Sequence, residues 1–357
     1  MTATAVAAAG QILRGAIAAR VFPAAAVEVG SSTGAIWRSA LGTLTFDEVG
    51  SAATTDTIFD LASLTKPMAT TSVALLLDAD RRLPLETPIA AIVPEWRGAD
   101  REPVTIRHLL EHASGLSARL LDRPPHTARA FEHDICAMPL EYPAGSRSLY
   151  SDLGFILLGF CCEVRGGAAL EALTAGVLAP LLAPSAGTEL FTSVPPAERV
   201  RTAPTTPLLE DERRGRRLVG EVHDNYAAAL GGFAGHAGLF GTVGGVGLFA
   251  RTVLRALAGH DAQPPFTAAT LRPAVARSRV PGSSRACGWD TMIATSSCGP
   301  RMSSSAFGHV GFTGTSLWID PMKDRYFVLL TNRVCGGGTS EEMQRVRRAF
   351  HEAVADL

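Results

Sequence analysis

Ser63 and Lys66 stand three positions apart, where the apolar run over residues 58–62 gives way to a helix pattern. Residues three apart share one face of a helix, so the serine hydroxyl and the lysine amine can meet. A serine hydroxyl is a weak nucleophile until a neighbouring base takes its proton, and a desolvated amine can be that base. The pair predicts a nucleophile and its activator, although Ser-x-x-Lys also arises by chance in chains of this length.

The rarity of lysine adds weight to this pair. The chain contains 33 Lys and Arg residues together, and only Lys66 and Lys323 are lysines. Arginine cannot be deprotonated in a protein and cannot serve as a base. A lysine kept next to Ser63 is therefore informative, but its role depends on companions elsewhere in the chain.

Tyr150 and Asp152 form a second candidate group, on a loop before the apolar run 155–160. Beside a lysine ammonium a phenol loses its proton more readily, because an opposite charge favours the ionised form. We therefore predict a lowered pKa for Tyr150, which would let it act as the base toward Ser63. In isolation, a half-buried aromatic and a helix N-cap explain the same two residues.

The third candidate group lies over residues 308–321. Glycines at 308, 311 and 314 are costly within a strand unless something approaches the backbone closely, and an acyl substrate lying along the strand would do so. The backbone N–H groups of Phe312 and Ser63 would supply the two donors that an oxyanion requires. His309 alone indicates little, since the chain has nine histidines.

Taken together and in this order, Ser63-Leu64-Thr65-Lys66, Tyr150-Ser151-Asp152 and His309-Val310-Gly311 resemble the three motifs of the serine β-lactamase and penicillin-binding-protein superfamily. The branch that they resemble most is the class C-like one, which includes esterases and D-amino-acid peptidases. Residues 105–116, 143–159 and 234–240 also resemble it, so the likeness runs nearly the full length.

This resemblance implies a role for each site residue. It implies an acyl-enzyme on Ser63, with Lys66 and Tyr150 sharing the base and acid roles. Asp152 and His309 are the supporting residues, and the amides of Ser63 and Phe312 form the oxyanion hole. The remaining expected substrate contacts are Val310, Gly311 and His236. For His236 and His223 a structural role is the favoured alternative.

Two departures from the family pattern bear on the substrate. Asp152 replaces the Asn that is usual in the lactamases of this branch, and its carboxylate would hold Lys66 charged and move the base role toward Tyr150. His309-Val310 replaces the Lys-Thr that grips a substrate carboxylate, which a mostly neutral His and an apolar Val grip poorly. These departures argue against β-lactam or peptidoglycan substrates and for an uncharged ester or amide.

The distribution of helix and strand patterns predicts an α/β (α+β) fold of the β-lactamase and DD-peptidase kind. Strand patterns occur near both chain ends, which predicts one antiparallel sheet built from the two ends and flanked by helices. We expect residues 1–82 and 285–357 to form this sheet subdomain with Ser63 and His309. Residues 83–284 are expected to form an inserted, mostly helical subdomain that carries Tyr150.

Composition narrows the cellular setting. A formal charge of −1 and 46% hydrophobic residues are typical of a soluble globular protein and do not indicate nucleic acid or membrane as partner. Residues 1–10 lack a basic region followed by an apolar one, so no signal peptide and a cytoplasmic location are expected. The six cysteines show no Cys-x-x-Cys spacing, so we expect buried free thiols, no metal and no cofactor.

The sequence thus predicts a serine hydrolase, an esterase acting on small uncharged esters or amides. A D-aminopeptidase or DD-carboxypeptidase, a weak β-lactamase and an acyltransferase stay open as alternatives. A non-catalytic binding module is the alternative from another class. Retention of Ser63, Lys66 and Tyr150 argues against it, because such a module has no need of all three.

Overall fold

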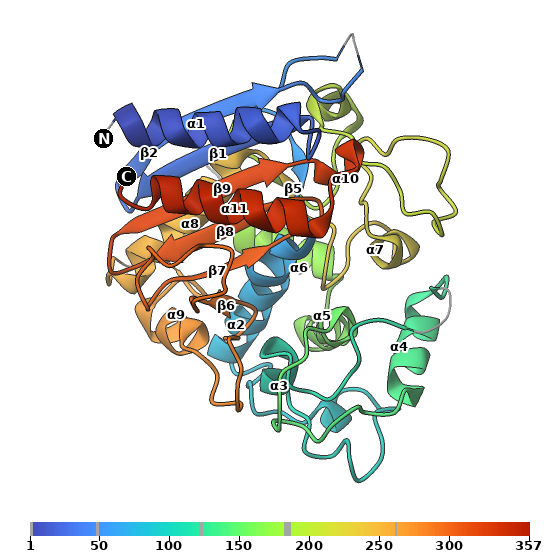
Figure 1. The fold of residues 1–357 in the computed structure, drawn as a ribbon. Helices are drawn as coiled ribbons and strands as arrows, with labels where there is room; N and C mark the ends of the chain where they lie inside the picture. The colour runs from blue at the N-terminus through green and yellow to red at the C-terminus, as the bar shows by residue number, and fades with distance from the viewer. Residues whose placement is uncertain (1–2, 48–49, 121–123, 182–186, 261–262) are drawn as a thin grey trace.

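The fold is built around one six-stranded antiparallel sheet, seen in Figure 1. The computed structural model describes residues 3–47, 50–120, 124–181, 187–260 and 263–357. The strands of the sheet, in spatial order, are β2 (Gly34–Gly42), β1 (Ala24–Ser31), β9 (Arg325–Thr331), β8 (Ser316–Asp320), β7 (Phe307–Val310) and β6 (Asp290–Thr291).

The two ends of the chain meet in this sheet, as the sequence predicts. Strand β1 pairs with β9, so that Val27 lies opposite Leu329. Helices α1 (Ala3–Ala18) and α11 (Ser340–Val354) contact each other and lie side by side over one face of the sheet (Figure 1). The α11 helix starts with a capping box between Thr339 and Glu342, which satisfies two backbone donors at its N-terminus.

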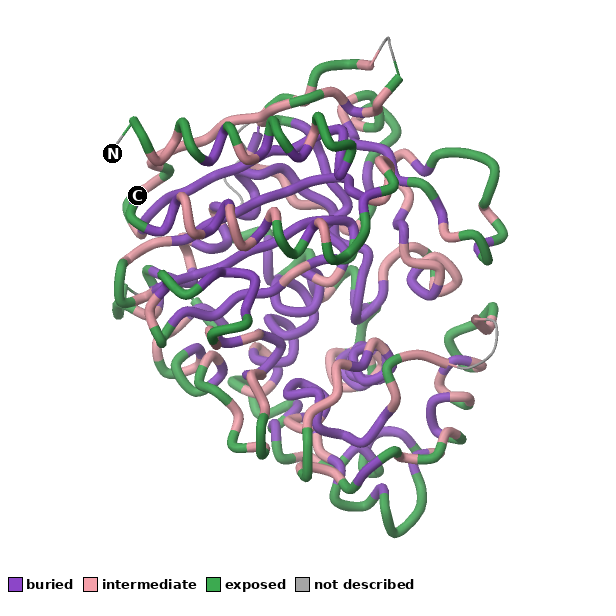
Figure 2. The backbone as a smooth tube through the Cα atoms, in the orientation of Figure 1, coloured by how far each residue is buried: buried purple, intermediate pink, exposed green. Residues whose placement is uncertain are grey.

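Both faces of the sheet are covered, which explains its composition. All eight residues of β1 are buried, as are most of β7, β8 and β9, whereas the edge strand β2 is mostly of intermediate exposure (Figure 2). A strand buried on both faces has little need for polar alternation, in keeping with the run Ala24 to Val27. Helix α8 (Val243–Leu257) covers the face opposite to α1 and α11, in contact with β1, β8 and β9, and packs in turn on α9 (Ala268–Val275).

Helices from the middle of the chain pack beside the sheet. The apolar α5 is buried along most of its length and contacts α2, α3, α4 and α6. The helices of this group are α2 (Ser72–Ala79), α3 (Ile106–Leu110), α4 (Ala128–Ala137), α5 (Asp152–Gly166) and α6 (Leu170–Leu178). Two short helices lie elsewhere in the sequence, α7 (Asn225–Ala229) and α10 (Arg333–Gly336). Helix α8, which the sequence assigns to the same inserted region, packs on the sheet instead. The boundaries of the insertion stay a prediction.

A second, small sheet fixes the segment that leads to Ser63. Its strands are β3 (Phe59–Asp60), β5 (Phe240–Gly241) and β4 (Leu190–Phe191), with β5 in the centre. The pairing of β3 with β5 fixes the chain at Phe59 and Asp60, shortly before Ser63.

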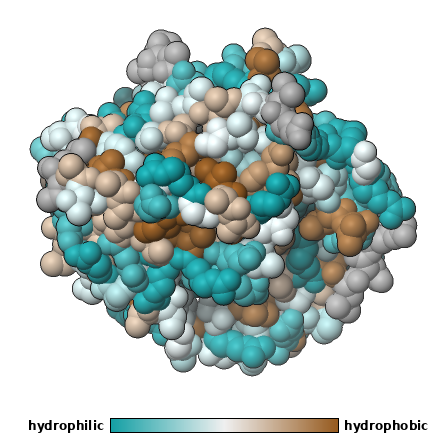
Figure 3. All heavy atoms as spheres, turned by 45° about the horizontal axis from the view of Figure 1, so that its top comes forward, coloured by the Kyte–Doolittle hydropathy of each residue, from teal (hydrophilic) through white to brown (hydrophobic). Residues whose placement is uncertain are grey.

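The lengths of the apolar helices and one face of the surface bear on possible membrane contact. Among the residues that the structure describes, no single helix is long and apolar enough to cross a membrane; α5 and α6 meet both criteria only jointly, and they are bent by 79°. On the face shown in Figure 3, hydrophilic residues are interspersed with hydrophobic ones.

Candidate active site

A strained turn presents Ser63. Ala62 has a φ of 49°, a left-handed conformation that residues other than glycine rarely adopt, and Ser63 follows it in a 3-10 helix over Ala62–Leu64. The buried carboxylate of Asp60 accepts hydrogen bonds from the backbone N–H of Ala62 at 2.8 Å and of His223 at 2.7 Å. These two bonds hold the turn in place.

Lys66 reaches Ser63 from the next turn of the chain. Its Nζ lies 3.1 Å from Ser63 Oγ. The expected α-helical face is wrong in detail: Ser63 lies in the 3-10 helix, Lys66 opens π-helical turns over Lys66–Thr71, and regular α-helix begins only with α2. In a 3-10 helix, side chains three apart eclipse each other, so the contact between the two residues survives.

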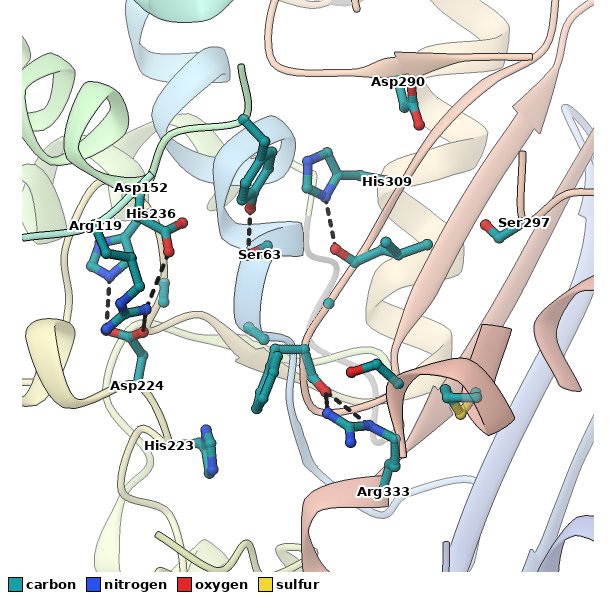
Figure 4. Close-up of a pocket in the computed structure, with 18 of the residues that line it drawn as sticks. Ser63, Arg119, Asp152, His223, Asp224, His236, Asp290, Ser297, His309 and Arg333 are labelled. Atoms are coloured by element: carbon teal, nitrogen blue, oxygen red, sulfur yellow. Dashed lines mark hydrogen bonds and ion pairs between the residues drawn. The ribbon is translucent and has the colours of Figure 1, made fainter. Parts of the chain in front are cut away.

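Tyr150 completes the group around Ser63, which is labelled in Figure 4. Its hydroxyl lies 2.8 Å from Ser63 Oγ, and Lys66 Nζ lies 4.8 Å from the centre of its ring. The His112 ring packs on the other side, with its centre 4.6 Å from that of Tyr150. The structure thus brings together the serine, lysine and tyrosine that the sequence singles out.

Lys66 is held in its charged form. Its side chain is fully buried, and Nζ donates to Asp152 Oδ1 at 2.8 Å and to the carbonyl of His236 at 3.1 Å. Burial lowers the pKa of the Lys66 amine, but the charges of Asp152 and Tyr150 outweigh it, so the pKa is raised. The predicted effect of Asp152 on Lys66 is therefore present in the structure.

The predicted lowering of the Tyr150 pKa is wrong. Burial raises the pKa of the phenol, and the Asp152 charge adds to this, so the opposing Lys66 charge does not bring it below its ordinary value. The resting site holds a protonated amine and a protonated phenol, both within hydrogen-bonding distance of Ser63 Oγ.

Arg119 links the lysine to a second charged group that the sequence did not indicate. Its guanidinium lies 3.2 Å from Asp152 Oδ2 and 3.1 Å from Asp224 Oδ2 (Figure 4). It also stacks on the Tyr226 ring, 4.0 Å from its centre. Asp224 accepts a hydrogen bond from His236 Nε2 at 2.7 Å and also caps α7. Burial raises the Asp224 pKa, but His236 and Arg119 outweigh it and hold the pKa far below its usual range.

His236 and His309 meet expectations in different ways. His236 is buried at the cavity wall, with Nε2 engaged by Asp224; its contact with substrate stays a prediction. His309 donates from Nδ1 to the carbonyl of Val310 at 2.9 Å. Burial and the nearby cations Arg285 and Lys66 hold the pKa of His309 well below its ordinary value, so it is neutral.

The glycines of the third motif make room for the protein itself, not for a substrate. A Cβ on Gly311 would lie 2.1 Å from Thr315 Oγ1 and 2.7 Å from the Leu61 carbonyl. A Cβ on Gly308 would meet Trp318 at 2.4 Å. Gly311 thus lets the end of β7 lie directly against the segment before Ser63, which corrects the expected reason for these glycines.

The catalytic group opens into a cavity of about 860 Å³. Ser63, Tyr150, His309 and the segment 310–312 line it. The Phe312 side chain is 51% exposed and lies 5.6 Å from the His223 ring and 4.7 Å from the Arg333 guanidinium.

Arg285 is a further cavity residue that sequence reasoning missed. It lies on the loop before β6, and its guanidinium sits 5.2 Å from the centre of the Tyr150 ring. Within the described ranges it has no ion pair. Nothing in its local sequence marks it, because the chain uses Arg almost everywhere that it needs a cation.

The titratable residues give no sign of a metal centre or a reactive thiol. Among the described residues, no group of three His, Cys, Asp or Glu side chains could hold a metal ion. All six cysteines are free, and burial raises the pKa of the Cys136 and Cys287 thiols to about 12. Such thiols are poor nucleophiles.

Comparisons with known proteins identify the family. The family model named Beta-lactamase matches residues 10–351. A protein of Escherichia coli K12, provisionally assigned as a D-alanyl-D-alanine carboxypeptidase, is 31% identical over 317 residues, which is 79% of this chain and 70% of that protein. An N-acetylmuramyl-L-alanine amidase of Bacillus subtilis is 28% identical over 312 residues, 78% of this chain and 68% of that protein.

Solved structures share the fold over nearly the whole chain. A β-lactamase from Sulfitobacter sp. EE-36 aligns with a TM-score of 0.77 at 19% identity, over 100% of this chain and 98% of that one. EstCE1, a hydrolase with promiscuous acyltransferase activity, aligns with a TM-score of 0.75 at 20% identity, over 98% of both chains. The chain belongs to the β-lactamase and penicillin-binding-protein family of serine hydrolases.

Proposed function

We propose that this protein hydrolyses small esters through an acyl-enzyme on Ser63. The observation that carries the proposal is the position of Ser63 Oγ, 3.1 Å from Lys66 Nζ and 2.8 Å from the Tyr150 hydroxyl at the wall of an open cavity. A nucleophile within hydrogen-bonding distance of two proton-transfer groups, one of them held by a third residue, is the general arrangement for covalent catalysis.

In the proposed acylation step, Ser63 Oγ attacks the acyl carbonyl carbon. The reactive form of the site has lost the Tyr150 proton to solvent, and Lys66 stabilises the resulting phenolate by its charge; this phenolate takes the Ser63 proton as the serine oxygen attacks. The electron pair of the carbonyl moves onto oxygen, where the amides of Ser63 and Phe312 donate hydrogen bonds. Collapse of this intermediate breaks the bond to the leaving alkoxide, to which Tyr150 passes the proton it took from Ser63, so that the alcohol departs and the phenolate is restored.

Deacylation repeats these transfers with water. The water loses a proton to Tyr150 as its oxygen adds to the acyl carbonyl, and collapse returns that proton to Ser63 Oγ and releases the acid. An alcohol or amine in place of water would give acyl transfer by the same steps. Product analysis in the presence of added alcohols separates the two.

The neutral state of His309 favours an uncharged substrate. A cation at this position would attract a substrate carboxylate, but His309 is uncharged and spends its one N–H on Val310. Val310 beside it is apolar. Strand β7 therefore offers a carboxylate no charged partner.

Arg285 favours a second candidate, a carboxypeptidase acting on substrates that end in a carboxylate. Its guanidinium faces the same cavity and lies beside Tyr150 without an ion pair in the described part of the chain. A planar guanidinium suits a carboxylate, with which it forms two parallel hydrogen bonds. The name of the Escherichia coli relative agrees with this candidate.

Covalent labelling tests the nucleophile. A fluorophosphonate is expected to add one adduct to the intact protein and none to Ser63→Ala. Hydrolysis of p-nitrophenyl acetate is expected to fall at least 100-fold in Lys66→Ala and to be unchanged in Lys323→Ala, which removes the other lysine. Labelling that survives Ser63→Ala, or equal turnover by Lys66→Ala and wild type, would refute the proposal and support a binding module.

A matched pair of esters separates the two candidates. Phenyl phenylacetate and its m-carboxyphenyl counterpart differ only in a carboxylate on the leaving group. Faster turnover of the uncharged ester supports the esterase. Faster turnover of the charged ester, lost in Arg285→Gln and kept in the exposed control Arg279→Gln, supports the carboxypeptidase.

A further inference from the structure

Arg347 is a buried cation with no acidic partner among the described residues. It lies on α11, is only 7% exposed and forms no ion pair within the described ranges. Its terminal nitrogen instead donates to two backbone carbonyls, Gly311 at 2.6 Å and Thr315 at 2.9 Å. A buried charge without a counter-charge is costly, so this position calls for an explanation beyond packing.

A second arginine, Arg333, donates hydrogen bonds to the carbonyl of the next peptide group, Phe312–Thr313. Arg333 donates from Nε to the Phe312 carbonyl at 3.2 Å, as Figure 4 shows, and from another nitrogen to Gly338 at 2.6 Å. Burial, together with the charge of the neighbouring Arg333, lowers the pKa of Arg347 to about 9. The two carbonyls that flank the Phe312 N–H are therefore both held by buried guanidinium groups.

The carbonyl of Gly311 does not need Arg347 to satisfy its hydrogen bonding. It already accepts the backbone N–H of Gly314 at 3.1 Å in the turn between β7 and β8. The guanidinium adds positive charge to a carbonyl that already has a partner. Its effect is therefore electrostatic.

The carbonyl of Gly311 and the N–H of Phe312 belong to one planar peptide group. In a trans peptide the two point in opposite directions, so a charge on the oxygen leaves the N–H facing away from it. That N–H donates no hydrogen bond within the described part of the chain. Withdrawal of electrons toward a charged partner of the oxygen makes the N–H a stronger donor.

We propose that Arg347 is a positioning residue that fixes and polarises the Gly311–Phe312 peptide, so that the Phe312 N–H becomes the stronger donor to the substrate oxyanion. This inference rests on the proposed acyl-enzyme function. It assigns to α11, whose residue Arg347 also lines the cavity that Ser63 faces, an electrostatic part in the chemistry at Ser63.

The carbonyl stretch of the acyl-enzyme measures this effect directly. A ¹³C=O-labelled activated aryl ester is used as probe, and isotope-edited infrared difference spectra report how strongly the acyl oxygen is polarised. Arg347→Gln is expected to raise the stretching frequency and to lower kcat about 10- to 100-fold with KM little changed. Arg345→Gln, which removes an exposed arginine from the same helix, is expected to match wild type.

Arg347→Lys keeps the experiment decisive where the glutamine variant does not fold. The same burial and the Arg333 charge act on the introduced amine, which is charged at low pH and loses its charge as pH rises, within one folded protein. The carbonyl stretch of this variant is expected to shift upward with pH more than that of wild type. An equal stretch in wild type, in Arg347→Gln and at every pH in Arg347→Lys would overturn the inference.

The outcome also separates this inference from the function on which it rests. Absence of any acyl-enzyme at Ser63 in the wild type refutes both. An acyl-enzyme with a stretch insensitive to residue 347 leaves the hydrolase intact and removes only the role of Arg347.

Discussion

The Asp152 carboxylate stabilises the charged form of Lys66. Its carboxylate lies 2.8 Å from Lys66 Nζ and is shared with Arg119 at 3.2 Å. Lys66 is fully buried, so without a counter-charge the amine would tend toward its neutral form. The Asp152 carboxylate is thus shared by two cations, and the Arg119 guanidinium is in turn shared by two carboxylates, Asp152 and Asp224.

Replacement of Asp152 by Asn is expected to lower the pKa of Lys66, since burial then acts unopposed by that carboxylate. Both Lys66 and Tyr150 have pKa values raised above their ordinary ones, so kcat/KM for p-nitrophenyl acetate should rise with pH well into the alkaline range. In Asp152→Asn this rise should move to lower pH. If the rise of kcat/KM stays at the same pH, or moves to higher pH, Asp152 does not raise the pKa of Lys66. Asp100→Asn, in an exposed turn, is the control.

At the scale of single residues, the sequence predicted which side chains meet at the site but not how burial shifts their pKa values. Ser63, Lys66, Tyr150 and Asp152 do meet, because each stands in a motif with a recognisable spacing. The direction of the Tyr150 pKa was missed, because depth of burial is set by segments far away, such as the His112 loop. Arg119, Arg285 and Arg347 were missed since no local pattern distinguishes them from the other arginines.

The contact between the end of β7 and the segment before Ser63 requires glycine. Gly311→Ala places a Cβ 2.1 Å from Thr315 Oγ1 and 2.7 Å from the Leu61 carbonyl. The strand must then move away from the nucleophile, at a cost of about 1–3 kcal/mol in the free energy of unfolding.

We therefore expect Gly311→Ala to lower both stability and the rate of fluorophosphonate labelling. Gly176→Ala on α6 is the matched control, because a Cβ there meets nothing within 4 Å. In that exposed helical position the same change is expected to stabilise by about 0.5–1 kcal/mol. Chemical denaturation of the two variants measures both, and an unaltered stability in Gly311→Ala would contradict the packing argument.

Element types were easier to predict than their local geometry. Strand composition near both chain ends correctly gave β1, β2 and β7 to β9. The 3-10 helix and π-helical turns around Ser63 were not foreseen, because the apolar periodicity that marks a helix resumes only at α2. Two contacts hold these irregular turns: a local bond from the Thr65 hydroxyl to the Ala62 carbonyl, and a tertiary bond from the Leu239 N–H to that hydroxyl.

The whole molecule is expected to respond to pH through Asp60. Burial raises the pKa of this carboxyl from 3.8 to about 6, despite hydrogen bonds from the His223 and Ala62 amides. The folded protein thus binds the proton more tightly than the unfolded chain. The stability due to protonation is fully present below pH 3.8 and is lost as pH rises through about 6.

The free energy of unfolding of Asp60→Asn, which cannot ionise, provides the test. Relative to this variant, wild type should lose about 1 kcal/mol between pH 5 and pH 7.5. Urea denaturation at the two pH values measures the difference. A relative stability that is constant or rises over this range would show that Asp60 is not held in the way described.

At the scale of the whole chain, the sheet built from both ends has a consequence for how the protein acquires activity. The Thr315 hydroxyl donates a hydrogen bond to the Leu61 carbonyl, 254 positions earlier in the chain. Strand β1 becomes an interior strand only when β9 pairs with it. Such distant contacts close late and slow folding. During synthesis, Ser63, Lys66 and Tyr150 leave the ribosome long before the strand that supports them. If the proposed activity holds, we expect these side chains to be inactive on the nascent chain until translation has passed β9.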